Sequence, residues 1–173
     1  MKQLISGGAR SGKSALAQAR ALQWQQQTGG RVVVVATATA EGDEMAARIA
    51  HHQAHRPDSW QLVEAPTNLA QTLAKYSDGN TLVLVDCLTL WLANELFGGN
   101  WPREKAALLE TLPGLPGPLI LIGNEVGQGV VPLGEGNRRF VDECGWLQQH
   151  LSPRMDRVTL TIAGLPLELK ERS

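Results

Sequence analysis

Apolar residues gather in short continuous runs along the chain, and each run has the length of a single strand. Val, Ile and Leu dominate these runs, which is typical of strands buried on both faces of a parallel sheet. Four runs of this kind are evident, a shorter one opens the chain, and a sixth ends in a glutamate. The predicted strands are residues 2–6, 31–37, 60–64, 81–86, 119–122 and 157–162.

The segments between these strands have apolar positions at the three- and four-residue spacing of amphipathic helices. They predict helices at residues 13–27, 43–55, 67–76, 88–97, 103–111 and 136–150. Two stretches rich in Gly and Pro, residues 98–102 and 113–118, are predicted to be turns. Because strands and helices alternate, we expect an α/β fold with a mostly parallel central sheet.

A phosphate-binding sequence follows the first predicted strand directly. Residues 7–14 fit the pattern G-x-x-x-x-G-K-S, in which consecutive backbone N–H groups surround phosphate oxygens. Lys13 is expected to reach the β- and γ-phosphates, and the Ser14 hydroxyl to coordinate Mg²⁺. A glycine-rich turn before a helix would explain the glycines but not the Lys13-Ser14 pair. The motif predicts a P-loop NTPase of RecA-like, three-layer architecture, with nucleotide contacts at Gly7, Gly8, Ala9, Arg10, Ser11, Gly12, Lys13 and Ser14.

Asp86 ends an apolar strand, which is where P-loop NTPases hold a carboxylate near the magnesium ion. In a parallel sheet, this residue and the Lys13-Ser14 turn emerge at the same carboxyl edge. Asp86 is therefore the predicted second magnesium ligand beside Ser14. In an alternative interpretation, it caps the helix that begins near Leu88.

Composition narrows the range of partners. The 173 residues suit a single domain, residues 1–173, and the formal net charge of −1 argues against a nucleic-acid-binding surface. Cys87 and Cys144 lie outside any C-x-x-C spacing, which argues against a zinc or redox site. We find neither a signal-peptide pattern nor an apolar run approaching the ~20 residues of a membrane span. These observations predict a cytoplasmic protein whose partners are small molecules or other protein chains.

Three of the four histidines lie within five positions, in the predicted helix 43–55. Helical spacing places His51 and His55 on one face and His52 on another. The imidazoles can stabilise the C-terminal end of a helix that Pro57 stops, or chelate a metal, although the Glu of H-E-x-x-H is missing. A neutral imidazole near a triphosphate can instead attack phosphorus and form a covalent phosphoramidate. Periodicity alone does not select among the three histidines.

Further motifs give the chain a resemblance to a known family. The segments D-E-M-A-A-R-I-x-H-H at residues 43–52 and N-E-V-G-x-G-V-V-P at residues 124–132 are far more specific than a phosphate loop alone. Together with Ala36-Thr37 and Arg56-Pro57, they make the chain similar to the bifunctional adenosylcobinamide kinase/adenosylcobinamide-phosphate guanylyltransferases of cobalamin biosynthesis. The similarity runs over nearly the whole length.

The resemblance implies two successive reactions on a corrinoid precursor. A nucleoside triphosphate, ATP or GTP, phosphorylates the aminopropanol hydroxyl of adenosylcobinamide, and GTP then supplies GMP to that phosphate to give adenosyl-GDP-cobinamide. Mg²⁺ and Lys13 would assist both transfers. The resemblance also implies that His51 is the guanylylated nucleophile and that the chain forms a homotrimer. The implied nucleotide contacts outside the phosphate loop are Ala36, Thr37, Ala38, His52, Gln53, Ala54, His55, Glu64 and Asp86.

Two segments depart from the family pattern. Gln53-Ala54-His55 stands where family members carry a turn with Lys and Gly, so one phosphate contact is lost and an imidazole is added. Residues 145–149 replace a G-R-x-N-Q pattern, and Trp146 takes the place of the charged side chain. Two other functions fit the nucleotide motifs. One is a simple P-loop small-molecule kinase, and the other is a nucleotide-dependent switch, although an N-K-x-D guanine motif is absent.

Overall fold

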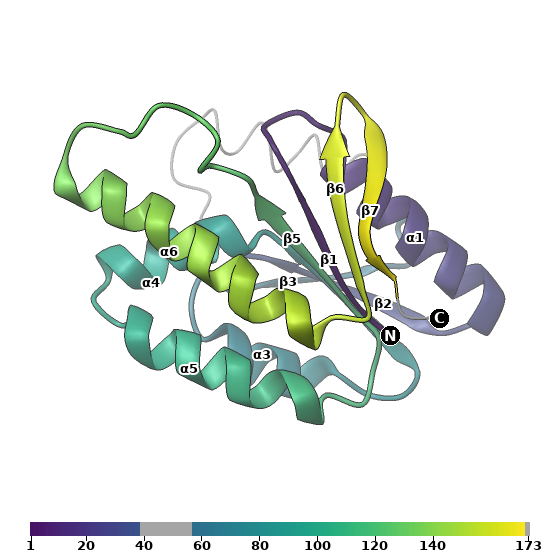
Figure 1. Ribbon diagram of the computed structural model, residues 1–173. Coiled ribbons are helices and arrows are strands. Elements are labelled where there is room, and N and C mark those ends of the chain that lie inside the picture. The colour runs from purple at the N-terminus through teal and green to yellow at the C-terminus, as the bar shows by residue number, and fades with distance from the viewer. Residues whose placement is uncertain (39–56, 172–173) are drawn as a thin grey trace.

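Seven strands form one continuous sheet in this computed structural model, which describes residues 1–38 and 57–171 (Figure 1). The strands are β1 (Lys2–Gly7), β2 (Arg31–Ala36), β3 (Gln61–Glu64), β4 (Thr81–Asp86), β5 (Leu119–Asn124), β6 (Arg157–Ile162) and β7 (Leu165–Glu171). Their spatial order is β3-β2-β4-β5-β1-β6-β7. The first six strands run parallel, and β7 pairs antiparallel with β6.

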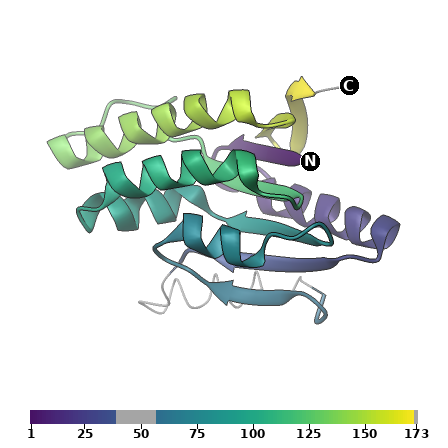
Figure 2. The same ribbon diagram turned by 90° about the horizontal axis from the view of Figure 1, so that it is seen from below.

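Helices cover both faces of the sheet (Figures 1 and 2). The helices are α1 (Lys13–Thr28), α3 (Leu69–Tyr76), α4 (Leu88–Phe97), α5 (Trp101–Thr111) and α6 (Glu135–Leu151). Helix α1 lies on one face and the other four lie on the opposite face, which gives the predicted three-layer α/β arrangement. The predicted helix 43–55 lies outside the described residues. Within the described ranges, no helix combines the length and the apolar character that crossing a bilayer requires.

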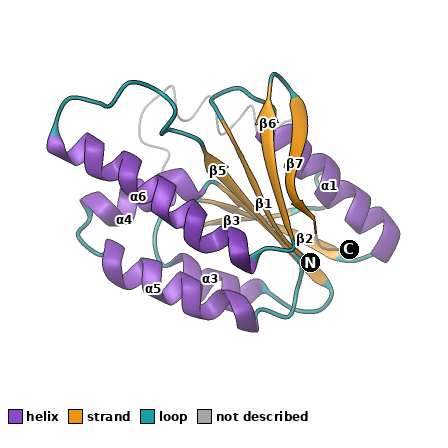
Figure 3. Ribbon diagram, viewed as in Figure 1, coloured by secondary structure: helices purple, strands orange, loops and turns teal. Residues whose placement is uncertain are grey.

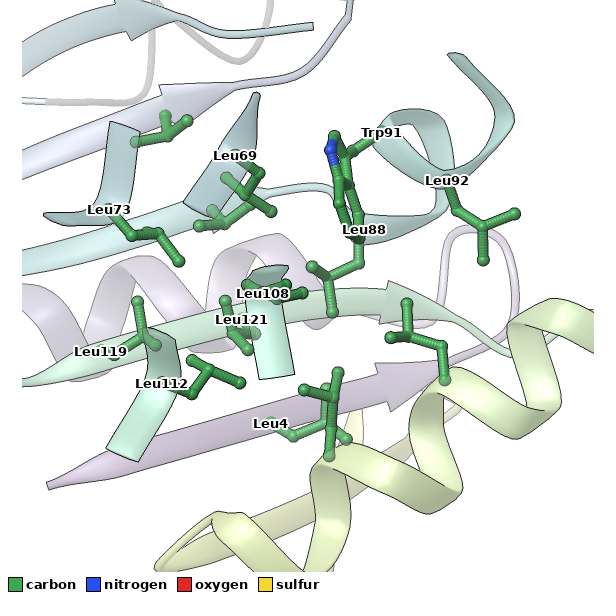
Figure 4. Close-up of a cluster of buried hydrophobic side chains, with 14 of the residues drawn as sticks. Leu4, Leu69, Leu73, Leu88, Trp91, Leu92, Leu108, Leu112, Leu119 and Leu121 are labelled. Atoms are coloured by element: carbon green, nitrogen blue, oxygen red, sulfur yellow. The ribbon is translucent and has the colours of Figure 1, made fainter. Parts of the chain in front are cut away.

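Neighbouring residues of a strand point to opposite faces of the sheet and fill two separate cores. In β4, Val83 and Val85 belong to the larger core, between the sheet and helices α3 to α6. Leu82 and Leu84 belong to the smaller core, between the sheet and α1. Figure 4 shows the larger core, in which Leu4 of β1 lies among leucines from the covering helices. Burial on both faces explains why the central strands are continuous apolar runs in the sequence.

The sequence does not predict β7, because this strand lacks a buried apolar run. Leu165, Leu167 and Leu169 are each more than half exposed, and they alternate with Pro166 or charged residues. A two-residue turn, residues 163–164, joins β7 to β6. Both turn residues have positive φ angles, +52° and +80°, as a tight hairpin turn of this length requires. The strand is therefore specified by its turn and its pairing with β6.

Helix α5 begins at Trp101, inside the stretch predicted to be a turn. Pro102 occupies its first turn, where a missing N–H costs no helical hydrogen bond. The Trp101 ring is buried in the larger core, so packing favours a helix that starts at this residue. The predicted start at residue 103 is therefore wrong, because proline favours the first turn of a helix as well as a turn.

Candidate nucleotide-binding site

The loop between β1 and α1 places the phosphate-binding motif at the carboxyl edge of the sheet. Gly7 ends β1 where a side chain would collide, since a Cβ there would lie 2.6 Å from the carbonyl oxygen of Thr161 and 2.7 Å from Ser11 Oγ. Gly12 has a φ of +95°, a left-handed conformation that favours glycine. Both glycines that define the motif are therefore required by the backbone path of the loop.

Helix α1 directs its N-terminus into this loop. Its first turn has no acidic residue, and no side chain in the described part of the chain caps it. The aligned peptide dipoles of a 16-residue helix leave partial positive charge at this end, where the first N–H groups lack helical partners. A phosphate bound in the loop would satisfy these donors.

The ammonium group of Lys13 is held inside the phosphate loop. Its Nζ donates a hydrogen bond to the Gly8 carbonyl oxygen and lies 3.4 Å from Ser11 Oγ. The residue is only 7% exposed, and burial lowers the pKa of its ammonium group below the usual value, against the opposing influence of Cys87 and Asp86. A phosphate oxygen could replace the Gly8 carbonyl as the acceptor for this cation.

Ser14 reaches the end of β4, where its hydroxyl donates to Asp86 Oδ2 over 3.4 Å. Hydroxyl and carboxylate oxygens are ligands that Mg²⁺ accepts, and its remaining positions are commonly filled by water and substrate phosphates. Across residues 1–38 and 57–171, no three His, Cys, Asp or Glu side chains are grouped as a metal cage. The Ser14–Asp86 pair therefore fits a magnesium ion that arrives together with a triphosphate.

Other predicted contacts at this edge form a row across three strands. Ala36 of β2 pairs with Glu64 of β3 on one side and with Asp86 of β4 on the other. Glu64 is exposed, while Ala36 and Ala38 are half-buried. The structure brings these residues to the same edge of the sheet as the phosphate loop, which is the geometry that their prediction as nucleotide contacts requires.

Thr37 holds the ends of β2 and β4 together. Its hydroxyl donates to the Cys87 carbonyl oxygen at 2.6 Å and accepts from the Cys87 N–H at 2.9 Å, and its own N–H donates to the Asp86 carbonyl oxygen at 3.2 Å. The side chain is fully buried. Thr37 therefore fixes the backbone beside the magnesium-ligand candidate Asp86, a role that the sequence did not predict.

Asn94 of α4 reinforces the same edge and was not identified from the sequence. Its Nδ2 donates to the carbonyl oxygens of Thr37 and Pro66 at 3.1 Å and 2.9 Å. It thereby ties the end of β2 to the loop that follows β3. A polar residue in a helix that is otherwise largely apolar, residues 88–97, is the signal that could have revealed it.

An open groove of about 730 Å³ lies beside α6. Gln148 links its wall to β1 and to the end of β5, because its side chain accepts from Ser6 Oγ at 2.8 Å and donates to the Asn124 carbonyl oxygen at 3.1 Å. Trp146, which replaces a charge in the family pattern, is about half exposed, and its ring lies 6.0 Å from Lys105 Nζ. The groove is lined by Glu125, Gly145, Gln148, Gln149, Ser152, Pro153 and Lys170.

Residues 3–169 match the model of the family described as cobinamide kinase / cobinamide phosphate guanyltransferase. The chain belongs to this family of enzymes. It is 51% identical to the bifunctional adenosylcobalamin biosynthesis protein CobP of Pseudomonas aeruginosa, with 98% of each chain covered. It is 34% identical to the bifunctional adenosylcobalamin biosynthesis protein CobU of Escherichia coli K12, with 98% of this chain and all of the relative covered. The resemblance inferred from the motifs is confirmed.

Solved structures of other proteins share the fold at low sequence identity. The flagellar accessory protein FlaH of Methanocaldococcus jannaschii has a TM-score of 0.57 and 14% identity, covering 99% of this chain and 78% of its own. A second solved structure, that of an ATPase domain, has a TM-score of 0.50 and 12% identity, covering 92% of this chain and 68% of its own. These similarities confirm the predicted P-loop NTPase fold with its mostly parallel sheet.

Several predicted site residues of this family member lie outside the described residues. They are His51, His52, Gln53, Ala54 and His55. The described residues that flank them are Ala38, which follows β2 at the carboxyl edge, and Pro57, which precedes β3. The roles of the histidines remain predictions from the sequence.

Proposed function

We propose that this enzyme phosphorylates adenosylcobinamide with a nucleoside triphosphate and then transfers GMP from GTP to the phosphate it has made. The relatives from Pseudomonas and Escherichia are named as bifunctional adenosylcobalamin biosynthesis proteins, which supports a pair of reactions. The observation that carries the proposal is the 3.4 Å hydrogen bond from Ser14 to Asp86. It joins the phosphate loop to a strand-end carboxylate, as a site for a triphosphate with its magnesium ion requires.

In the kinase reaction, the phosphate loop holds the γ-phosphate while the substrate hydroxyl attacks in line. A bond forms from the hydroxyl oxygen to phosphorus while the hydroxyl gives up its proton. The bond from phosphorus to the β–γ bridging oxygen breaks, and the nucleoside diphosphate leaves. Lys13 and the loop N–H groups stabilise the charge on the transferring oxygens. Mg²⁺ held by Ser14 and Asp86 would add further charge neutralisation. Positioning and electrostatics supply most of the catalysis in reactions of this type.

In the guanylyl transfer, an imidazole nitrogen of His51 forms a bond to the α-phosphorus of GTP, and pyrophosphate leaves. The phosphate oxygen of the corrinoid then attacks the same phosphorus and displaces the imidazole, which restores the enzyme. The family motif around residues 43–52 supports this assignment. The position of Ala38 also supports it, because the segment that carries His51 follows this residue from the carboxyl edge.

We assign recognition of the guanine base to Glu64. This exposed residue ends β3, and Ala36 of β2 lies between it and Asp86 in the row of strand ends. A carboxylate can accept paired hydrogen bonds from the N1–H and amino groups of guanine. The remaining family contacts, from Ala38 to His55, and the homotrimer belong to the same proposal, and light scattering of the purified protein tests the trimer.

The test is to incubate the protein with Mg²⁺ and GTP labelled at the α-phosphate, then measure acid-labile, alkali-stable label on the protein. We expect label on the wild type and none on His51→Ala. His150→Ala is the matched control, because this fourth histidine lies on α6 and contacts the Trp146 carbonyl oxygen. Label that persists in His51→Ala but disappears in His52→Ala or His55→Ala would show that His51 is not the nucleophile.

The same experiment separates the alternative functions. A simple small-molecule kinase would phosphorylate cobinamide without forming a protein adduct. A nucleotide-dependent switch would hydrolyse GTP slowly and transfer nothing to cobinamide. Either result would contradict the two-step proposal.

A further inference from the structure

The β6–β7 hairpin lies against the phosphate loop (Figure 3). At the hairpin turn, the N–H of Gly164 donates to the Ser11 carbonyl oxygen at 3.1 Å. A Cβ on Gly12 would lie 3.2 Å from the Gly164 Cα, so the two backbones are in close contact. The loop is thus supported from the outside by an element that follows it by about 150 positions in the sequence.

Thr161 of β6 makes the side-chain part of this contact. Its Oγ1 lies 2.7 Å from Ser11 Oγ and 3.2 Å from the carbonyl oxygen of Ser6. The residue is 2% exposed. Ser11 Oγ in turn lies 3.4 Å from Lys13 Nζ.

These contacts form a series of hydrogen bonds that runs from Lys13 to the Ser6 carbonyl oxygen. The groups at its two ends determine which atom donates in each bond. The Ser6 carbonyl can only accept, so Thr161 gives it the one hydroxyl proton that it has. Ser11 must then donate to Thr161, which leaves a lone pair of Ser11 to accept from Lys13, a group that only donates. Each hydroxyl is therefore used once as donor and once as acceptor, and Ser11 has a defined orientation toward the phosphate-binding lysine.

We propose that Thr161 is a positioning residue for nucleotide binding, which acts by orienting Ser11 and thereby the phosphate loop around Lys13. The inference rests on the nucleotide site proposed above. A loop that is already shaped for phosphate avoids the entropy cost of ordering its backbone when the ligand binds. Without the Thr161 hydroxyl, the buried Ser11 proton loses its acceptor, and the loop gains alternative arrangements that do not bind phosphate.

Thr159 provides a matched control on the same strand and the same face of the sheet. It is fully buried, and its hydroxyl also has two partners, accepting from Arg20 at 2.8 Å and donating to Glu168 at 2.8 Å. These partners tie α1 to β7 and do not include the phosphate loop. A Thr→Val substitution at either position removes one buried hydroxyl from β6 while keeping the branched shape.

The experiment measures the dissociation constant of Mg²⁺–GTP by calorimetry, together with the melting temperature of each variant. We expect Thr161→Val to raise the constant about tenfold, the equivalent of one hydrogen bond of ordinary strength. Thr159→Val should lower the melting temperature about as much as Thr161→Val does, because each removes one buried hydroxyl. It should change the dissociation constant of Mg²⁺–GTP less than about twofold. Thr161→Ser, which keeps the hydroxyl, should restore most of the affinity.

Substitution of Ser11 tests the same hydrogen bond from the side of its other partner. Ser11→Ala should also weaken binding, and the Ser11→Ala/Thr161→Val double variant should bind no more weakly than the weaker single variant, because both remove one shared interaction. Thr161→Ala, which also removes the hydroxyl, carries the test if Thr161→Val does not fold. Wild-type affinity in Thr161→Val, equal losses in Thr159→Val, or additive losses in the double variant would overturn the inference. A wild-type protein that does not bind Mg²⁺–GTP would instead overturn the nucleotide site itself.

Discussion

The hydroxyl of Ser14 donates to Asp86 Oδ2 over 3.4 Å, which connects the first turn of α1 to the end of β4. The two residues are 72 positions apart in the sequence, and the parallel sheet brings them to one edge. Both oxygens are suitable magnesium ligands, so the pair defines where the metal and the triphosphate would meet.

Asp86→Asn should preserve the fold and reduce kcat/KM for GTP about 100-fold, because an amide oxygen neutralises far less of the metal charge than a carboxylate. Magnesium titrations of both half-reactions measure the effect, and excess Mg²⁺ should recover part of the activity. Asp78→Asn is the control, since this exposed carboxylate pairs with Arg31 at the opposite edge. An unchanged magnesium requirement in Asp86→Asn would exclude Asp86 as a ligand.

Lys13→Ala should impair both cobinamide phosphorylation and GMP transfer by about 10²–10³-fold, because a single charged donor to phosphate oxygens contributes on this scale. Separate assays with cobinamide and with cobinamide phosphate measure the two reactions. Lys75→Ala, at the end of α3, should leave both rates unchanged. Normal cobinamide phosphorylation in Lys13→Ala would mean that the two reactions do not share the phosphate loop.

Thr37→Val should destabilise the protein by about 1–3 kcal/mol, because it leaves the buried N–H and carbonyl groups of Cys87 without the hydroxyl partner. Urea unfolding curves give the change in free energy. Thr37→Ser retains the hydroxyl and should recover most of the loss. If Thr37→Val were as stable as the wild type, the hydroxyl would not hold the two strand ends together.

The acid sensitivity of the fold should depend on Glu168. Burial alone would raise the pKa of its carboxyl, but hydrogen bonds from Thr159 and Arg157 and the charge of Arg20 outweigh burial and hold the pKa below its usual value. A carboxyl whose folded pKa is depressed stabilises the protein above its unfolded pKa of about 4.3, and this stability is lost as the pH falls through the folded value.

Between pH ~5 and ~3, the wild type should therefore lose about 1 kcal/mol more stability than Glu168→Gln. Denaturant unfolding at several pH values measures the difference. Glu110→Gln, on an exposed position of α5, should behave like the wild type. Parallel pH profiles for the wild type and Glu168→Gln would show that the ion pairs of Glu168 with Arg20 and Arg157 do not contribute to the acid sensitivity of the fold.

The central strands and the phosphate loop were predictable because local sequence specifies them. In β4, neighbouring residues such as Val83 and Leu84 are buried in different cores, so positions 82–85 are all apolar and the strand is evident in the sequence. The Gly7 and Gly12 positions were predictable for a similar reason, since only glycine fits the path of the loop at these points.

The supports of the site were not predictable, because their roles depend on contacts between distant segments. Thr161 is a β-branched residue of a kind that is common in strands, and nothing nearby in the sequence indicates that it reaches Ser11. Thr37 and Asn94 likewise act through partners on other elements. β7 escaped prediction because an exposed edge strand needs no apolar run.

The contact between the hairpin turn and the phosphate loop also bears on how the chain matures on the ribosome. Residues 7–14 leave the exit tunnel early, but Thr161 and Gly164, which complete their surroundings, are translated about 150 residues later. A nascent chain stalled before β6 would carry the whole nucleotide motif without this support. The full affinity for nucleotide would then arise only after the final hairpin has left the ribosome, and incomplete chains would bind nucleotide more weakly than the finished protein.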